Sequence, residues 1–480
     1  MKWLFVALLL SAWCTVRTEA ITPHVPDTAA PAALPAGGAQ QVVRDGYARA
    51  GDARALTYER SAQPCVLADR AGDGAAANGG CWIAESGQRR ADIREWGADP
   101  RGLRSSALAF AAIARLPGAL LVTFPPGRFR LPCSAAARGF VFGGDVSFAG
   151  AGRDRTVIAL DPGCRLVGDH ALFRWDGRSH IRISGLTLDL ATPRPPAEGL
   201  FAALDFRAYA ASAHDISVRN VAIIGGVTGS FLLSFGAAGG HMLSDLVVTR
   251  SRFVLAAPAH TQNQCLGLST VNGSGHITDF AITRDVCINA GMQIDGDHGT
   301  VANNDIAGFA FGTGIFFAFS TGARASCHDV SATGNFIHDS PVGLDVNNTA
   351  AGGMEVTCPH SKIRHNVLHD LGGAGIVNFG NDTLIEDNVA YDNGRNGNRG
   401  AGGIGDQAGF FLNVSAAAEA RNARVTLRGN VAYDDRAGTQ RYGYVDNAMV
   451  RGPITLSRNR FSGATAGVRI NSLPGVVHIR

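Results

Sequence analysis

Residues 333–337 read Thr-Gly-Asn-Phe-Ile, and residues 364–368 read Arg-His-Asn-Val-Leu. The same pattern, an asparagine between two short apolar-alternating segments, recurs at 302–306, 386–390 and 428–432. The central asparagines, with one more near the C-terminus, are Asn304, Asn335, Asn366, Asn388, Asn430 and Asn459. Their spacings are 31, 31, 22, 42 and 29 residues. Periods of this length indicate a solenoid of stacked coils, with loops inserted in the longer ones.

A second element follows the asparagine strands: a glycine that opens another strand. The clearest copies begin at Gly291, Gly314, Gly343 and Gly375. Each coil is therefore expected to run strand, turn, strand, asparagine turn, strand. Asparagine tolerates left-handed backbone and bonds locally, so stacked copies predict an internal asparagine ladder. Asp285 stands where an earlier coil should carry its asparagine. The pattern predicts an all-β solenoid.

The start of the repeats carries a resemblance to a known family. Residues 91–100 read Ala-Asp-Ile-Arg-Glu-Trp-Gly-Ala-Asp-Pro, a helical stretch covers 107–113, and 122–131 read Val-Thr-Phe-Pro-Pro-Gly-Arg-Phe-Arg-Leu. This opening resembles pectate-lyase-superfamily and polygalacturonase-related proteins, and the segment before it resembles the lead-in of phage tailspike-like chains. The resemblance implies a right-handed parallel β-helix (a pectin-lyase-like solenoid) over 91–480, with an N-terminal capping helix and a lead-in segment at 21–90.

Composition narrows the class of protein. The 61 glycines and 46% hydrophobic residues exclude a disordered chain. A net charge of +3 gives no sign of a nucleic-acid or membrane partner. Residues 1–20 read as a signal peptide, with Lys2, an apolar core and a small-residue cleavage site ending at Ala20. We expect a secreted or periplasmic protein, whose oligomeric state stays open.

Export gives the cysteines a role, since disulfides form in oxidising compartments. Cys327 and Cys358 each lie eight residues before a repeat asparagine, so they occupy equivalent places on adjacent coils and are expected to pair. Cys265 and Cys287 differ by 22 residues, one bare coil. Pairing of neighbours along the chain is also expected for the remaining four, Cys65 with Cys81 and Cys133 with Cys164. No CxxC motif or metal-like histidine spacing accompanies them, so we expect no metal at the cysteines.

The glycine-led strands are the expected binding face, because long loops leave both of their ends. These loops are 256–264, 318–328, 347–361 and 394–407. Loops of such length in a compact repeat usually bind ligands. With the apolar residues of each strand directed inward, the outward residues are Gln293, Asp295, Phe316, Asp345 and Asn347, and a turn with Asp297 and His298 follows directly.

Paired carboxylates on this face predict glycosidic-bond hydrolysis of a polysaccharide without a cofactor. Asp295 and Asp345 are expected two coils apart, about 9.6 Å along the axis. That separation is near the upper limit for an inverting acid and base pair. Asp297 is a third catalytic candidate. Phe316 is expected to stack on a sugar ring, and Gln293, His298 and Asn347 are expected to contact it.

Two other functions stay open. A polysaccharide lyase or epimerase acting on uronic-acid polymers would use Lys362 as base, with Arg364 on the same face contacting substrate. Either Ca²⁺ or a cationic side chain would neutralise the uronate carboxylate, and Asp295, Asp297 and Asp345 are the candidate cluster for Ca²⁺. A non-catalytic carbohydrate-binding or surface protein is the third possibility. The polygalacturonase motif set is not intact: Asp297-His298-Gly299 and Lys362-Ile363-Arg364 are partial echoes. The row of His338 and His369 is interpreted as structural.

Overall fold

In the computed structural model the chain divides into two compact units, Met1–Glu85 and Ser86–Arg480. The structure describes residues 22–27, 29–34, 39–65, 74–76, 79–84, 90–191, 193–195, 200–226, 229–257, 263–271, 274–317, 327–345, 347–400, 403–413, 424–436 and 438–480. The expected signal peptide lies outside these residues. Among the described residues, no helix has the length and apolar character needed to cross a membrane.

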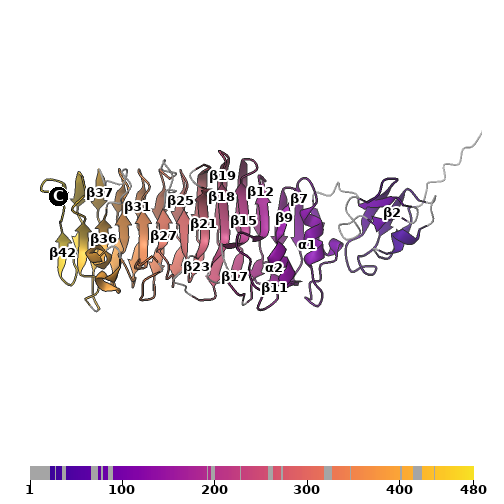
Figure 1. The fold of residues 1–480 in the computed structure, drawn as a ribbon, viewed down its shortest axis with the longest axis horizontal. Helices are drawn as coiled ribbons and strands as arrows, with labels where there is room; N and C mark the ends of the chain where they lie inside the picture. Colours follow the sequence, from indigo (N-terminus) through magenta and orange to yellow (C-terminus); the bar gives the residue numbers. More distant parts are fainter. Residues whose placement is uncertain are drawn as a thin grey trace, which may run out of the picture. The chain divides into compact units, whose positions relative to one another are not determined.

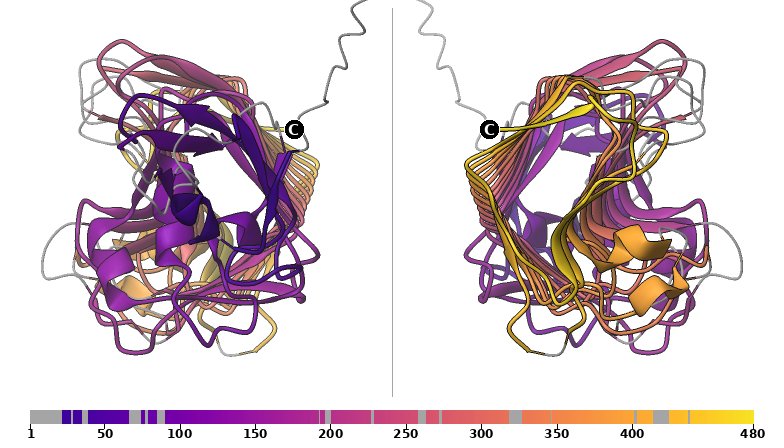
Figure 2. Two further views of the ribbon diagram at one scale, coloured as in Figure 1. Left: turned by 90° about the vertical axis from the view of Figure 1, so that its right-hand side faces the viewer. Right: turned by 90° about the vertical axis from the view of Figure 1, so that its left-hand side faces the viewer.

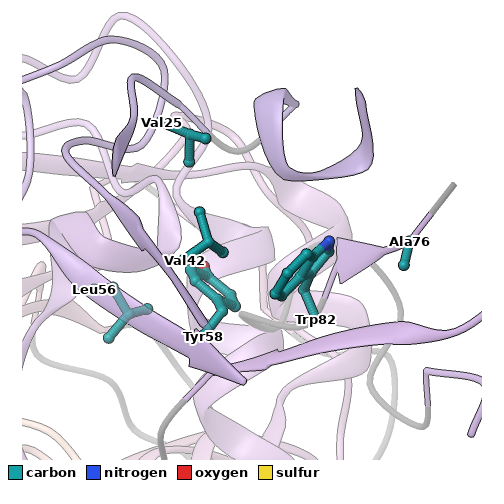
Figure 3. Packing of buried hydrophobic residues seen from close by; sticks show 6 residues of the cluster. All are labelled: Val25, Val42, Leu56, Tyr58, Ala76 and Trp82. Atoms are coloured by element: carbon teal, nitrogen blue, oxygen red, sulfur yellow. The ribbon is translucent and has the colours of Figure 1, made fainter. Parts of the chain in front are cut away.

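The first unit is a small five-stranded sheet with its own core. The sheet has the order β1-β2-β3-β5-β4. Its strands are β1 His24–Val25, β2 Gln41–Arg44, β3 Leu56–Ser61, β4 Gly74–Ala75 and β5 Cys81–Ala84, and a short 3-10 helix η1 covers Ala30–Ala33. Figure 3 shows the buried side chains that pack together, which are Val25, Val42, Leu56, Tyr58, Ala76 and Trp82.

The second unit consists of three long parallel sheets, each built from one strand per coil (Figure 1). The first sheet contains β6 Arg90–Asp92, β7 Leu120–Phe124, β10 Val146–Gly150, β13 Ile181–Ser184, β16 Ala213–Arg219, β19 Met242–Thr249, β22 His276–Thr283, β25 Thr300–Ala302, β28 Ser331–Thr333, β31 Lys362–Arg364, β34 Leu384–Glu386, β37 Val425–Arg428, β40 Ile454–Ser457 and β43 Val477–Ile479. The second contains β8 Gly127–Leu131, β11 Thr156–Leu160, β14 Thr187–Asp189, β17 Ala222–Gly226, β20 Arg252–Leu255, β23 Val286–Ile288, β26 Asp305–Ala307, β29 Phe336–His338, β32 Val367–His369, β35 Val389–Tyr391, β38 Val431–Tyr433 and β41 Arg460–Phe461. The third contains β9 Phe140–Phe142, β12 Ala171–Asp176, β15 Phe201–Ala208, β18 Ser230–Ala237, β21 Gln264–Thr270, β24 Gly291–Ile294, β27 Thr313–Phe317, β30 Gly352–Val356, β33 Ile376–Asn378, β36 Ala408–Leu412, β39 Tyr442–Asp446 and β42 Ala466–Arg469.

Alternation of side chains along each short strand fills the interior of the coils. Aromatic rings stack along the axis in the N-terminal coils, where the Trp175 ring lies 4.6 Å from that of Phe142 and 4.9 Å from that of Phe206. The helix α1, Ala107–Ala114, closes this end, and its Phe110 packs 5.1 Å from Phe173. Viewed along the axis, the strands of successive coils superpose (Figure 2). The predicted fold class, a right-handed parallel β-helix with an N-terminal capping helix, is confirmed.

The predicted asparagine ladder runs between the first and second sheets. Asn304 Nδ2 donates to Asn335 Oδ1 at 3.0 Å, and the backbone N–H of Asn304 donates to the same oxygen at 3.1 Å. The same two bonds link Asn335 to Asn366, and the pattern continues to Asn459. Each amide therefore satisfies buried backbone groups at the turn, which explains why the residue recurs.

The glycine at or next to the start of the strands β24, β27, β30 and β33 has a packing reason. At Gly353 a Cβ atom would lie 2.5 Å from Leu368 Cδ2 and 2.5 Å from the Gly375 carbonyl oxygen. In the coil that contains Gly353, the third-sheet strand is β30, Gly352–Val356, which pairs with β27 and β33. The prediction that Gly343 opens it is wrong, because the described residues 339–345 and 347–351 belong to an inserted loop that the simple repeat spacing does not reveal. The predicted loop 347–361 likewise contains this strand.

All four predicted disulfides are present. They join Cys65 to Cys81, Cys133 to Cys164, Cys265 to Cys287 and Cys327 to Cys358. The last pair has a Cα–Cα distance of 5.1 Å, as expected for equivalent positions on adjacent coils. Four disulfides fit a protein that matures in an oxidising compartment outside the cytosol.

Candidate functional site

The outer face of the third sheet carries one side chain from each coil in a continuous row. Gln293 on β24 is in register with Phe316 on β27, and Phe316 is in register with Glu355 on β30. Val377 on β33 follows in the next coil. Adjacent strands of a sheet lie about 4.8 Å apart. The residues Gln293, Phe316 and Glu355 are all partly exposed, so an amide, an aromatic ring and a carboxyl group lie side by side on this face.

Glu355 is the ionisable member of this row, and its surroundings favour the protonated form. Burial, followed by the negative charge of Asp406, raises the pKa of Glu355 to about 7. Asp406 is itself only 8% exposed to solvent. A carboxyl group with a pKa near 7 can both donate and accept a proton at neutral pH. Two interacting carboxyl groups with different protonation preferences are the usual basis of acid and base catalysis.

Asp406, whose charge acts on Glu355, belongs to a long insertion between a strand of the second sheet and a strand of the third. Residues 392–407 include two short 3-10 helices, η4 Gly397–Arg399 and η5 Gly403–Gln407. Figure 2 shows the orange helical turns near residue 400 lying outside the stack of coils. Asn396 holds the insertion to the preceding loop, since its Oδ1 accepts the Gly343 N–H at 2.7 Å and its Nδ2 donates to the Gly343 carbonyl at 2.6 Å. The insertion is thereby bonded at its centre to another loop.

Asp345 and Asn347 do not lie on the third sheet, so their predicted place in the row is wrong. Asp345 is 6% exposed and lies in the loop 339–351. Its Oδ1 accepts the N–H groups of Asn347 at 2.8 Å and Thr349 at 2.9 Å, and its Oδ2 accepts the Gly312 N–H at 3.1 Å. Asp345 thus organises a turn, and Glu355 occupies the register position that the sequence analysis assigned to it.

Asp295 follows β24 directly and is 2% exposed. Its Oδ2 accepts two hydrogen bonds from Thr270 of the preceding coil, from the hydroxyl at 2.7 Å and from the backbone N–H at 3.1 Å. This carboxylate ties the end of β24 to the end of β21. The arrangement resembles a structural clamp more than an exposed acid or base.

Lys362 and Arg364 belong to β31 of the first sheet and not to the third-sheet row. They do flank a buried Ile363 and share one outer face, as predicted. Lys362 is exposed, while Arg364 Nε lies 3.1 Å from Glu386 Oε2 on the next strand. Their position on another sheet separates them from the carboxyl groups described above.

Asp297 and His298 form the turn that leads from the third sheet to the first. Asp297 is 3% exposed, and its Oδ1 accepts the His328 N–H at 2.8 Å. Its Oδ2 lies 3.5 Å from His328 Nε2 and 3.7 Å from His276 Nδ1. Burial raises the pKa of Asp297, and the neighbouring histidines, above all His328, act in the opposite direction. The predicted turn therefore contains a buried carboxylate among imidazole rings.

The candidate calcium cluster is not assembled. Asp295 accepts hydrogen bonds from Thr270, and Asp297 accepts one from the His328 N–H. Asp345 accepts the N–H groups of Asn347 and Thr349 in its own loop and that of Gly312. Calcium requires six to eight oxygen ligands converging on one point. Among the described residues, these three carboxylates do not form a group that could hold a metal ion. The donor set therefore does not fit Ca²⁺.

Rings stack on the outer face of the second sheet, where the row of His338 and His369 was interpreted as structural. Their rings lie 5.4 Å apart, that of His369 lies 4.7 Å from Tyr391, and that of Tyr391 lies 4.9 Å from Tyr433. His338 is also held between Asp305 and Asp339. The stacking follows the coil repeat.

A charged group on the outer face of the third sheet was missed by the sequence analysis. Asp205 is 1% exposed, and its Oδ2 accepts Arg174 Nε at 2.8 Å and Arg207 Nε at 2.7 Å. Arg207 also lies over the ring of Tyr209 at 4.9 Å, and burial raises the pKa of Tyr209. Arg174, Asp205 and Ser234 are in register, so this group continues the row toward the N-terminus.

Glu355 was missed as well, although a signal for it exists in the sequence. Residues 353–356 read Gly-Met-Glu-Val, the same glycine-apolar-X-apolar pattern as 291–294 and 314–317. Gly353 also lies 22 residues before Gly375, the length of a bare coil. Asp406 has no such signal, because it lies in an insertion outside the repeat.

Comparisons with known proteins agree on the fold. No family model and no curated protein matches this sequence. Among solved structures, the A-module of the Azotobacter vinelandii mannuronan C-5 epimerase AlgE4 has a TM-score of 0.62 at 16% identity, covering 81% of this chain and 99% of that chain. The corresponding AlgE6 module has a TM-score of 0.54 at 16% identity, over 80% and 99% of the chains. PfbA, a surface adhesin of Streptococcus pneumoniae, has a TM-score of 0.51 at 13% identity, over 80% and 91%.

These neighbours include two enzyme modules and an adhesin, so one architecture serves different activities among them. The strand order, the ladder and the comparisons together assign this chain to the parallel β-helix proteins.

Proposed function

We propose that the protein is a carbohydrate-active enzyme that hydrolyses glycosidic bonds in a polysaccharide, with Glu355 as the proton-transferring group. The observation that carries this proposal is the raised pKa of Glu355, about 7, on a partly exposed strand position. In its protonated form Glu355 donates to the glycosidic oxygen of the leaving sugar. Asp406, the second carboxyl group, is placed to stabilise the positive charge that develops on the sugar ring or to activate water.

The neighbours of Glu355 in the row support a saccharide as ligand. The partly exposed ring of Phe316, one coil away, offers an apolar surface of the size of a sugar ring. Gln293, one coil further, offers both a hydrogen-bond donor and an acceptor for sugar hydroxyls. A row parallel to the solenoid axis suits an extended chain with several sugars. The carboxylate-based hydrolysis predicted from sequence is thus retained with different residues.

The test is the variant E355Q, assayed by release of reducing ends from a panel of neutral and uronic-acid polysaccharides. Glutamine keeps the shape of the side chain but cannot transfer a proton, so kcat should fall by about 10²–10⁴-fold. Glu386→Gln is the matched control, because Glu386 pairs with Arg364 and Arg428 on the first sheet. Wild-type turnover by E355Q on the substrate that the wild-type protein cleaves would refute the proposal.

A uronate lyase or epimerase is the second candidate, favoured by the guanidinium groups of Arg174 and Arg207 on the same sheet face. Such groups can pair with uronate carboxylates. The structures similar to this chain include two mannuronan epimerase modules. A lyase would create an unsaturated sugar that absorbs ultraviolet light, and an epimerase would change the uronate composition without new chain ends. Saturable binding without any of these products would instead favour the non-catalytic carbohydrate-binding role.

Export of the protein belongs to the same proposal. A polysaccharide substrate outside the cell requires the enzyme to leave the cytosol, and the four disulfides accord with that route. The N-terminal sequence of the mature protein, expected to begin near residue 21, tests the signal peptide directly.

A further inference from the structure

A cluster of metal-ligating side chains lies at the turn between the third and first sheets, outside the proposed catalytic row. One ligand atom from each of His298, His328 and Asp329 lies within 4.8 Å of the others. We propose that these three residues bind a divalent transition-metal cation, with Zn²⁺ as the representative ion. This site is independent of the proposed hydrolase chemistry.

The orientation of the two imidazole rings is the first argument. His328 Nδ1 lies 2.9 Å from Asp329 Oδ2, while its Nε2 lies 3.5 Å from Asp297 Oδ2. His298 Nε2 lies 3.8 Å from Asp329 Oδ2, while its Nδ1 lies 3.5 Å from Thr278 Oγ1. Each ring therefore directs one nitrogen toward the common point and the other toward an oxygen partner. Metal-bound histidines have this arrangement, in which an outer carboxylate or hydroxyl fixes the ring and its tautomer.

The donor set is the second argument. Two imidazole nitrogens and one carboxylate suit Zn²⁺ and its transition-metal neighbours, whereas Ca²⁺ and Mg²⁺ prefer oxygen ligands alone. The side chains of His298, His328 and Asp329 are 54%, 38% and 48% exposed, so an ion can enter from solvent. Three protein ligands leave a further coordination position for water or another ligand.

The chain contains a second His-His-Asp group with the same ring packing and backbone pairing, and this copy serves as an internal comparison. His180 and His214 pack edge to face at 4.9 Å, as His298 and His328 do at 5.0 Å. In both copies the backbone N–H of the first histidine donates to the carbonyl of the second, at 3.0 Å and 3.1 Å. Asp215 follows His214 in sequence as Asp329 follows His328.

The two copies differ in the neighbours of the carboxylate and of the rings. In the upstream copy, His180 Nδ1 lies 2.8 Å from Asp215 Oδ2, while His214 Nδ1 lies 3.1 Å from Ser179 Oγ. Arg182 also donates to both oxygens of Asp215 at 2.6 Å and 2.7 Å. The corresponding position two residues after His298 is Thr300, which is exposed. Asp215 is thus neutralised by a guanidinium group, and no ion-pair partner of Asp329 other than histidine occurs among the described residues. A metal ion is expected at Asp329 and not at Asp215.

The other metal-ligating cluster in the described part of the chain fails the same criterion. It comprises Asp339, His369 and Asp370. Arg436 Nη1 lies 3.1 Å from Asp370 Oδ1 and 3.3 Å from Asp370 Oδ2. The Arg436 guanidinium group already pairs with the Asp370 carboxylate, so this cluster is interpreted as an ion-pair network.

Isothermal titration of the untagged, chelator-treated full chain with Zn²⁺ tests the proposal. The wild-type protein should bind one ion per chain. Variants H328A and D329A remove ligands and should weaken binding at least 100-fold, and D297N should weaken it about 10–100-fold by releasing the His328 ring. Absence of stoichiometric binding, or wild-type affinity in H328A and D329A, would overturn the assignment.

Exchanging the distinguishing residue tests the site without touching a ligand. T300R should place a guanidinium group on Asp329 and abolish binding, while H214A, in the upstream copy, should bind zinc like the wild type. Because Thr300 is exposed, T300R should fold, and zinc should raise the melting temperature of the wild type but not of T300R. Wild-type zinc affinity in T300R or loss of binding in H214A would contradict the inference.

Discussion

Asp285 occupies a ladder position that asparagine fills in the coils that follow. Its Oδ1 accepts the Ser251 N–H at 2.7 Å, as an asparagine oxygen would, and its own N–H donates to Asn304 Oδ1 at 2.9 Å. Its Oδ2 replaces the amide group that, in Asn304, donates to the Ile282 carbonyl at 3.1 Å. No described group donates to this oxygen. Burial raises the pKa of Asp285 to about 7, because the charged carboxylate is removed from water, and the backbone hydrogen bond from Ser251 acts in the opposite direction.

The variant D285N should therefore be more stable than the wild type, increasingly so at higher pH. The unfolded chain releases the proton near pH 4, whereas the folded protein keeps it until about pH 7, so the wild type loses stability between these values. Above pH 7 the gain from asparagine should reach at most about 4 kcal/mol. Urea unfolding at pH 5 and pH 8 measures the difference, with the exposed Asp154→Asn as control. Equal stability of D285N and wild type at pH 8 would show that the ladder tolerates the charge.

Asp406 contributes to Glu355 through charge, which predicts a shift in the pH dependence of activity. Burial and the negative charge of Asp406 raise the pKa of Glu355, so D406N should lower that pKa. If protonated Glu355 is the acid, activity falls as pH rises through its pKa, and this limb of kcat/KM should move to lower pH in D406N. The position of the limb is the readout, because the rate itself also depends on Asp406. An unshifted limb would separate Asp406 from the titration of Glu355.

At the scale of the strand, glycine at the entrance to the third sheet decides which segment can pair. G353A would bring a methyl group within 2.5 Å of Leu368 Cδ2 and of the Gly375 carbonyl oxygen. Overpacking of this kind should cost about 1–3 kcal/mol. Gly143→Ala is the matched control, since its Cβ would make an ordinary contact of 3.4 Å with the Ala114 carbonyl oxygen. Urea unfolding should separate the two variants, and equal midpoints would show that the strand can shift to make room.

The inserted loops illustrate how strands and turns exchange roles in the sequence pattern. The sequence of residues 343–347 matches the pattern of a third-sheet strand. The Asp345 side chain instead accepts three backbone N–H groups, as in a turn. Asp side chains compete with strand pairing by bonding nearby N–H groups. The segment 352–356 is free of such a residue at its start and pairs with β27. Local pattern alone ranks the two segments almost equally, and pairing across coils separates them.

At the scale of the whole molecule, each unit has its own means of burying apolar surface. The first unit has a six-residue core cluster, and the β-helix is closed by α1 over Phe124, Phe140, Phe148 and Phe173. In a solenoid each coil buries its apolar surface against the neighbouring coils, so a stack with a capped end should be stable without another domain. Residues 86–480 expressed alone should therefore retain the β-rich circular dichroism and the melting temperature of the β-helix in the full chain. A large drop in that melting temperature would show that the stack depends on the first unit.

The periodic part of this protein could be predicted from sequence, because a coil is a local unit that repeats. The asparagine ladder, the pairing of Cys327 with Cys358 and the outward positions of Gln293 and Phe316 follow from it, whereas the capping helix was implied by the family resemblance. Insertions interrupt the period, and there the tertiary structure alone decided the result. It placed Glu355 instead of Asp345 in the row, brought Asp406 beside Glu355, and joined His298 to His328 and Asp329. These encounters depend on stacking of one coil on the next, which no short stretch of sequence encodes.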